Sequence, residues 1–315
     1  MDSKDYNICQ KEMLKSPKGT PVWARLAEML GYSTKESLRK QFNREKNRRG
    51  DLYEPSREYM EPVVGVIDLE TLYMELAGWN LYQDRFATNA ILRESCLLSW
   101  AAMYVKTGKI VSDILTPEES VSRDSFRVAA SARDFIHSCN ILIGHNIKQF
   151  DDKVFNTEFL LHELKPVDHK QIDTLEIMRT EFKLPSNKLG YVNKRLGIKQ
   201  KMENEGLPLW IACSSGDSDA LSRMMEYNIG DVVATEELYW KIRPFAGASV
   251  PTFQPYSEST ERTCDCGCSE FVHDGYFYTN SGKYNRMACS NCGSLFRDKK
   301  NLLPKNKRDN ILISI

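Results

Sequence analysis

The sequence predicts an α/β domain, with a mixed sheet flanked by helices and smaller units at both ends. The apolar stretch at residues 63–71 is rich in β-branched residues, as buried strands are. Beyond residue 124, stretches of helix and strand character alternate, which indicates a sheet covered by helices. A basic segment at residues 1–50 and a cysteine cluster at residues 264–292 mark the additional units.

The apolar stretch ends in Asp68 and Glu70, two residues apart, which a strand would direct to the same face. Two carboxylates about 4 Å apart repel by ~4 kcal/mol at an effective dielectric constant of ~20. Such a pair therefore requires a proton, a basic side chain or a metal dication. Taken alone, it has two interpretations, half of a metal site or a cap on the following turn.

The composition of the 315 residues, 41% hydrophobic and 27% charged, is that of a globular protein. The longest apolar stretch, residues 96–105, is far shorter than the roughly 18 residues that cross a bilayer. Residues 1–5 do not begin a secretion signal, so we expect a cytoplasmic protein without a membrane partner. The net charge of zero conceals basic flanks, since residues 1–50 carry 12 basic and 6 acidic side chains and residues 261–315 carry 9 and 6. Such flanks suit a polyanion.

Residues 1–50 are expected to form two short helices. An apolar stripe with helical spacing occupies residues 23–30, Gly31 interrupts it, and residues 33–36 have a capping-box pattern. This order resembles a helix-turn-helix DNA-binding unit, and the alternative is a two-helix adaptor with a solvated basic face. Candidate nucleic-acid contacts on the second helix are Lys35, Arg39 and Lys46.

The sheet is expected between residues 62 and 246. Periodicity predicts strands at 63–71, 90–104, 110–115, 141–146 and 171–173, and helices at 124–139, 174–182 and 220–245. Another helix follows Asp151, whose anion the helix dipole would tolerate. Asp173 precedes a helix as well and is expected to cap it rather than to bind a metal. Tyr227 and Asp231 share a face of the last helix, which taken singly is the pattern of a surface pair.

Three motifs follow one another in the chain: Asp68-x-Glu70-Thr71, His145-Asn146-x-x-x-Phe150-Asp151 and Tyr227-x-x-x-Asp231. Together they resemble the DEDD superfamily of 3′–5′ exonucleases, in the DEDDy branch marked by Tyr-x-x-x-Asp. The resemblance covers about residues 62–245 and implies an RNase H-like fold. The connecting segments are most similar to exonucleases of the bacteriophage type, which implies the host cytoplasm if a phage encodes the chain.

The resemblance also implies the roles of the site residues. Its metal-binding carboxylates correspond to Asp68, Glu70, Asp151 and Asp231. Tyr227 corresponds to the tyrosine that orients the attacking water, and its phenol, with a pKa near ~10, would be a poor resting base. Two dications stabilise both the attacking and the leaving oxygen of a phosphodiester, and oxygen ligands select Mg²⁺ or Mn²⁺. We also expect His145 and Asn146 to fix their loop and Lys148 to contact phosphate.

The sequence thus predicts a two-metal 3′–5′ exonuclease acting on DNA, with replication or recombination proteins as possible partners. An endonuclease or a ribonuclease of the same fold is the first alternative. The second is a catalytically inactive nucleic-acid-binding protein with a role in replication or regulation. The presence of all four carboxylates and the tyrosine argues against this alternative.

Five cysteines near the C-terminus form two groups: Cys264, Cys266 and Cys268, then Cys289 and Cys292. Two cysteine knuckles across a hairpin describe a zinc ribbon with one structural Zn²⁺, and similar ribbons are appended to phage exonucleases. Because Cys266 and Cys292 are each followed by Gly, we expect Cys264 and Cys266 as ligands, with Cys268 as the alternative. Disulfides are disfavoured by the expected cytoplasmic location.

The expected organisation has six parts. These are a helix-turn-helix-like unit (1–50), a linker (51–61), the exonuclease domain (62–246), a second linker (247–260), the zinc ribbon (261–298) and a basic tail (299–315).

Overall fold

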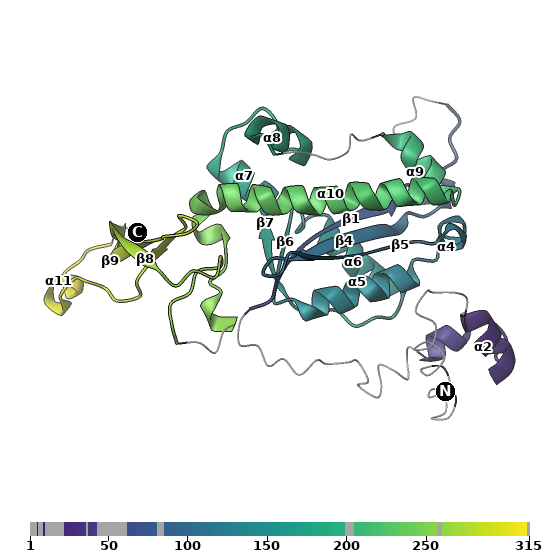
Figure 1. The fold of residues 1–315 in the computed structure, drawn as a ribbon, viewed down its shortest axis with the longest axis horizontal. Coiled ribbons are helices and arrows are strands. Elements are labelled where there is room, and N and C mark those ends of the chain that lie inside the picture. Colours follow the sequence, from purple (N-terminus) through teal and green to yellow (C-terminus); the bar gives the residue numbers. More distant parts are fainter. Residues whose placement is uncertain are drawn as a thin grey trace.

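A five-stranded mixed sheet forms the centre of the molecule (Figure 1). The computed structural model describes residues 5, 9, 22–35, 37–42, 62–80, 85–198, 205–256 and 260–313, and of residues 22–25 the backbone only. The strand order is β5-β4-β1-β6-β7. These strands are β1 (Val64–Leu72), β4 (Cys96–Tyr104), β5 (Lys109–Ile114), β6 (Ile141–Gly144) and β7 (Lys170–Asp173).

The middle strand β1 is antiparallel to β4 and parallel to β6. On one face of β1, Ile67 and Leu69 belong to a core that includes buried side chains of α5 (Phe126–Ser138) and α6 (Asp151–Leu161). On the other face, Val66 packs in a second core with α10 (Ser218–Ile242). Since side chains alternate along a strand, Asp68 and Glu70 continue the face of Val66, towards α10.

The close packing of α5 depends on a glycine. A Cβ atom at Gly65 would lie 2.7 Å from Cζ of Phe135 and 2.9 Å from Sγ of Cys139. Glycine is therefore required at this point of β1 for α5 to approach the sheet.

The described ranges contain further helices and short 3-10 turns. They are α2 (Val22–Leu30), α4 (Pro117–Ser122), α7 (Thr174–Glu181), α8 (Leu189–Leu196), α9 (Leu207–Ser214), α11 (Lys305–Asp309) and the 3-10 turns η1 (Thr88–Ala90), η2 (Arg243–Phe245), η3 (Gly247–Ser249) and η4 (Gln254–Tyr256). Helices α4, α8, α9 and α11, each of eight residues or fewer, were not predicted from the sequence. The predicted strand at 90–104 is divided into two strands, β3 (Ile91–Arg93) and β4. The first of them, β3, pairs with β2 (Glu75–Leu76).

A separate three-stranded sheet follows α10, in the order β10-β9-β8 (Figure 1). Its strands are β8 (Phe271–Thr279), β9 (Gly282–Cys289) and β10 (Leu295–Arg297). The segment 247–260 differs from the expected linker, because Val250 and Phe253 are buried in the α10 core. The basic tail folds back in part, since the amide of Leu302 donates to the carbonyl of Lys283 at 2.7 Å.

The N-terminal unit contains α2, a turn at Gly31 with φ of 72°, and helical residues 35 and 37–42. Its small core consists of Cys9, Leu26, Ala27, Leu38 and Phe42. Lys46 and the expected linker 51–61 lie outside the described residues.

Among the helices of the described ranges, none has the length and apolar character that crossing a membrane requires.

Candidate active site

Three carboxylates from two elements meet on the α10 side of the sheet. Asp68 and Glu70 come from β1 and Asp231 from the middle of α10. Each offers an oxygen, and these oxygens all lie within 4.8 Å of one another. The two-residue period of β1 and the passage of α10 across this face bring the three together.

Asp151 adds a fourth carboxylate from the first residue of α6. It is 2% exposed, and its Oδ1 accepts a hydrogen bond of 3.2 Å from the amide of Leu69, the residue between Asp68 and Glu70. Because β1 and β6 are parallel, the chain leaving β6 reaches the carboxyl end of β1. Burial first, and then charge repulsion that includes Asp151, raises the pKa of both Asp68 and Glu70, so the four groups form one electrostatic cluster.

The neighbouring Asp152 is turned away from this cluster. Its Oδ1 lies 3.1 Å from Nε2 of His169, and its Oδ2 accepts a hydrogen bond from Asn156 at 3.1 Å. These contacts lower the pKa of Asp152 although its partial burial opposes them. Asp151 is accordingly the carboxylate that the structure brings to β1, as the motif spacing predicted.

The carboxylates of the cluster hold protons more tightly than ordinary ones. Burial raises the pKa of Glu70 to about 8, that of Asp151 to about 7 and that of Asp231 to about 6. Burial, and then repulsion from the other three, raises the pKa of Asp68 well above its usual value. Within the described ranges, none of the four pairs with a Lys or Arg. Oxygen donors in this arrangement fit divalent cations, which would replace the missing positive charge.

Tyr227 lies one turn before Asp231 on α10, and its phenol donates a hydrogen bond to that carboxylate. Burial and the negative charge of Asp231 raise the pKa of Tyr227 above its usual value. The phenol therefore stays protonated at neutral pH and acts as a hydrogen-bond donor.

Asn228 also belongs to the site, although it was not predicted. Its Nδ2 donates to Oδ2 of Asp68 at 2.6 Å, and its Oδ1 accepts from Oγ of Ser99 at 3.2 Å. Both Asn228 and Ser99 are fully buried. A serine within the otherwise apolar strand at 96–104 is the sequence signal that could have indicated a polar partner here.

The loop after β6 is held by its polar side chains. The ring nitrogens of His145 lie 2.9 Å from Oγ1 of Thr174 and 2.9 Å from the carbonyl of Asn187. Asp173 caps α7 through its hydrogen bonds with the amides of Leu175 and Glu176 and also accepts from the amide of Asn146 at 2.9 Å, so it serves as the expected cap.

Lys148 lies on the same loop, where its ammonium forms an ion pair with Glu176. A phosphate contact at Lys148 would therefore compete with this pair.

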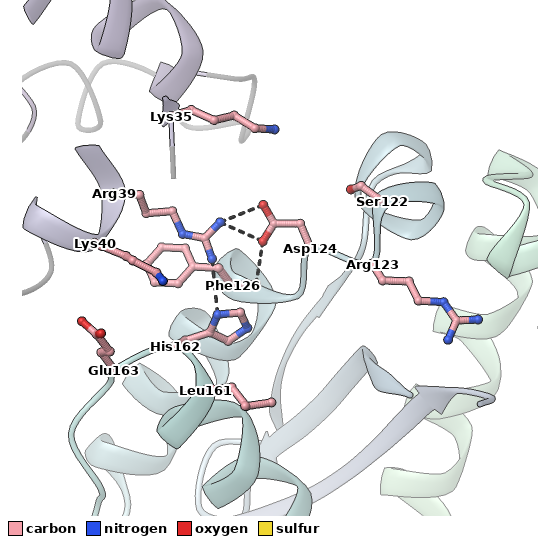
Figure 2. Close-up of a pocket in the computed structure, with 10 residues that line it drawn as sticks. All are labelled: Lys35, Arg39, Lys40, Ser122, Arg123, Asp124, Phe126, Leu161, His162 and Glu163. Atoms are coloured by element: carbon pink, nitrogen blue, oxygen red, sulfur yellow. Dashed lines mark hydrogen bonds and ion pairs between the residues drawn. The ribbon is translucent and has the colours of Figure 1, made fainter. Parts of the chain in front are cut away.

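Arg39 contacts the α/β domain instead of pointing to solvent (Figure 2). Its Nη1 donates to both oxygens of Asp124, at 2.8 and 2.7 Å, and its guanidinium lies 3.6 Å from the ring centre of Phe126. Lys35 lines the same pocket, which has a volume of about 330 Å³. A DNA contact at Arg39 would therefore compete with the acidic and aromatic partners that hold the guanidinium on the domain.

Four cysteine sulfurs gather beside the C-terminal sheet, those of Cys264, Cys266, Cys289 and Cys292. The pairs Cys264–Cys292 and Cys266–Cys289 have Sγ separations of 3.5 and 3.6 Å, far beyond a disulfide bond. Four thiolates this close suit one tetrahedral Zn²⁺ about 2.3 Å from each sulfur. Cys268 is turned aside, with its sulfur 3.4 Å from the amide of Glu270.

A buried ion pair joins the first cysteine knuckle to the end of α10. Asp265, between two of the gathered cysteines, pairs with Arg243 and accepts a hydrogen bond of 2.5 Å from the phenol of Tyr239. The side chains of Arg243 and Asp265 are 4% and 2% exposed. The knuckle is therefore anchored to the helix that carries Tyr227 and Asp231.

Comparisons with family models and with solved structures both give matches. Residues 96–243 match the family model of the RNase_H superfamily, a range that contains Asp151 and Asp231 but begins after Asp68 and Glu70. A family B DNA polymerase from the hyperthermophilic archaeon Pyrobaculum calidifontis is similar in structure, with a TM-score of 0.44 and 16% identity. That match covers 58% of this chain and 25% of the polymerase chain. No curated protein matches.

The mixed sheet, its flanking helices and the family match confirm the predicted RNase H-like fold. Together with the carboxylate cluster, this fold supports nuclease activity.

Proposed function

We propose that this protein is a metal-dependent 3′–5′ exonuclease that hydrolyses the phosphodiester bonds of DNA. The observation that carries the proposal is the convergence of four carboxylates from β1, α6 and α10, none of them paired with a basic side chain in the described ranges. Carboxylates that only stabilise a fold are expected to pair with a Lys or Arg. In a nuclease, divalent cations take the place of that basic side chain.

Asp68, Glu70, Asp151 and Asp231 would hold two Mg²⁺ or Mn²⁺ ions. Bound dications stabilise the charge on the attacking and leaving oxygens. Asn228 fixes one oxygen of Asp68 and thereby orients the other. The Tyr227 phenol keeps its proton and would orient the attacking water as a hydrogen-bond partner rather than remove a proton from it, and donation to the water would compete with the bond to Asp231.

The 3′ polarity is supported by the order of the motifs and by Tyr227-x-x-x-Asp231, the pattern of the DEDDy branch, and the choice of DNA by the likeness of the connecting segments to bacteriophage-type exonucleases. The zinc ribbon is part of the proposal, with Cys264, Cys266, Cys289 and Cys292 as ligands of one structural Zn²⁺. Kinship with the bacteriophage-type enzymes and a role beside replication or recombination proteins remain predictions from the sequence.

Two adjacent aspartates provide a matched test. The variants Asp151→Ala and Asp152→Ala are incubated with end-labelled DNA and Mg²⁺, and thermal unfolding and zinc content are measured for both. We expect Asp151→Ala to lose at least about 100-fold in rate, as removal of a preorganised electrostatic group does. Asp152→Ala is expected to retain most activity, because its side chain faces His169. Equal rates for Asp151→Ala and wild type would overturn the proposal.

A further inference from the structure

Two exposed tyrosines share one face of the β8–β9 hairpin. Tyr276 and Tyr278 are 44% and 64% exposed. They pair across the strands with Asn285 and Lys283, so these four side chains point to the same side. The ammonium of Lys283 lies 3.6 Å from the ring centre of Tyr276 and 5.8 Å from that of Tyr278. We call this surface the tyrosine face.

The tyrosine face belongs to the side of the hairpin that carries Phe296, a neighbour of the residue after α10. Nearer the cysteines, Phe296 pairs with Met287, which shares a face with Lys283 on β9. The guanidinium of Arg243, at the end of α10, lies 5.6 Å from the ring centre of Phe296. The base of the face therefore lies next to the end of α10, whereas Tyr276 and Tyr278, towards the tip, are exposed. From Arg243 to Asp231, α10 rises about 18 Å along its axis.

The charge around this surface favours a polyanion. Residues 271–313 carry 8 basic and 3 acidic side chains. Alternate residues of one strand lie about 6.8 Å apart, so the two rings offer separate stacking surfaces, and the ammonium of Lys283 lies over the ring of Tyr276. Aromatic rings interleaved with basic side chains are the common device for binding single-stranded nucleic acid, because every base has a π-face.

We propose that the tyrosine face binds single-stranded DNA by stacking and leads it along α10 to the carboxylate cluster. This inference rests on the proposed nuclease function for its direction, whereas the binding itself does not depend on cleavage. Lys283 would contact the phosphate that links two stacked bases.

Phe277 provides the matched control. It lies between the two tyrosines in sequence, is 43% exposed and points to the opposite face, where the guanidinium of Arg297 lies 5.8 Å from its ring centre. The experiment measures fluorescence anisotropy of labelled oligothymidylate with the full chain and no added Mg²⁺ or Mn²⁺. The variants are Tyr276→Ala, Tyr278→Ala, Phe277→Ala and Lys283→Ala, and the zinc content of each reports folding of the ribbon.

We expect each tyrosine variant to bind about 10-fold more weakly and Phe277→Ala to bind as wild type does. Lys283→Ala should reduce the slope of log affinity against log salt by about 0.7, the loss of one phosphate contact. In Tyr278→Trp, affinity should be retained and the indole fluorescence should be quenched by the DNA.

The proposed role of the tyrosine face would be overturned if both tyrosine variants bound DNA as tightly as the wild type, or if Phe277→Ala lost as much affinity as they do. A separate cleavage assay with Mg²⁺ distinguishes the two proposals. If binding depends on the tyrosines but no DNA is cleaved, the proposed nuclease function is contradicted and the proposed binding surface is supported. If DNA is cleaved but binding does not depend on the tyrosines, the binding surface is contradicted and the nuclease function is supported.

Discussion

The amide of Asn228 donates a 2.6 Å hydrogen bond to Asp68, which lies 160 residues earlier in the chain. Ser99 donates to the amide oxygen of Asn228, so a chain of three polar side chains, of which Ser99 and Asn228 are fully buried, crosses from β4 to α10 and β1. A hydrogen bond from Asn228 favours the ionised form of Asp68 and opposes the rise of its pKa. It also fixes the orientation of this carboxylate for a cation.

Asn228→Leu should impair metal use more than folding. Loss of an orienting partner beside a metal ligand costs about 10- to 100-fold in metal affinity or activity. The measurement is the Mg²⁺ concentration that gives half-maximal cleavage, together with the melting temperature. Ser99→Ala removes only the outer member of the chain and should shift the Mg²⁺ requirement less. A wild-type Mg²⁺ requirement in Asn228→Leu would show that Asp68 needs no such partner.

Without added Mg²⁺ or Mn²⁺, the folded protein should lose stability as pH rises from about 5 to about 8. The pKa of Glu70 is raised from 4.5 to about 8, and that of Asp231 from 3.8 to about 6. A carboxyl with a raised pKa binds its proton more tightly in the folded state, so its contribution to stability is complete at low pH and disappears as the group ionises. Melting temperatures across this pH range measure the loss.

Glu70→Gln sharpens the pH test, because glutamine keeps the shape of the side chain without its charge. At pH 8 and without dications, this variant should melt above the wild type, and added Mg²⁺ should stabilise it less. A wild-type melting temperature that rises between pH 5 and pH 8 would contradict the repulsion inferred within the cluster.

The zinc ligands can be assigned by two neighbouring substitutions. Cys266→Ser should lower the zinc content well below one ion per chain, whereas Cys268→Ser should leave it unchanged, because the Cys268 sulfur contacts the amide of Glu270 instead of the other sulfurs. Elemental analysis of the purified variants gives the answer. Loss of zinc in Cys268→Ser with retention in Cys266→Ser would exchange the two assignments.

Breaking the ion pair between Arg243 and Asp265 should strongly destabilise the attachment of the ribbon. Arg243→Met leaves a buried carboxylate without its counter-charge, which costs about 3–5 kcal/mol of unfolding free energy. The exposed pair of Arg286 and Asp274 in the same hairpin is the control, and Arg286→Met should cost less than about 1 kcal/mol. Urea unfolding compares the two variants, and similar costs would mean that the buried pair does not anchor the knuckle.

The sequence sufficed to predict those elements whose own residues determine them. The β-branched stretch at 63–71 predicted a strand that the structure places at Val64–Leu72, and the apolar periodicity at 220–245 predicted the helix at Ser218–Ile242. The same-face positions of Asp68 and Glu70 followed from the period of a strand. The local sequence pattern therefore predicted the strand and the fact that its two carboxylates share one face.

Local sequence patterns could not predict contacts between segments that are distant in the chain. Nothing near Asn228 in sequence marks it as the partner of Asp68, because this contact exists only once α10 lies across β1. Likewise, Arg39 had the pattern of a solvated basic residue, and its role changed when Asp124 and Phe126 proved to be its partners. Val250 and Phe253 lie among Pro and Ser residues typical of linkers, yet burial against α10 decides their structure.

The proposed exonuclease is tested most directly by the order in which labels leave DNA. Linear DNA labelled at the 3′ or the 5′ end, and circular single-stranded DNA, are incubated with Mg²⁺ and the wild-type protein or Asp231→Ala. We predict that the 3′ label is released first, that circles survive and that Asp231→Ala releases nothing. Cut circles, earlier release of the 5′ label or full activity of Asp231→Ala would contradict a 3′–5′ exonuclease centred on these carboxylates.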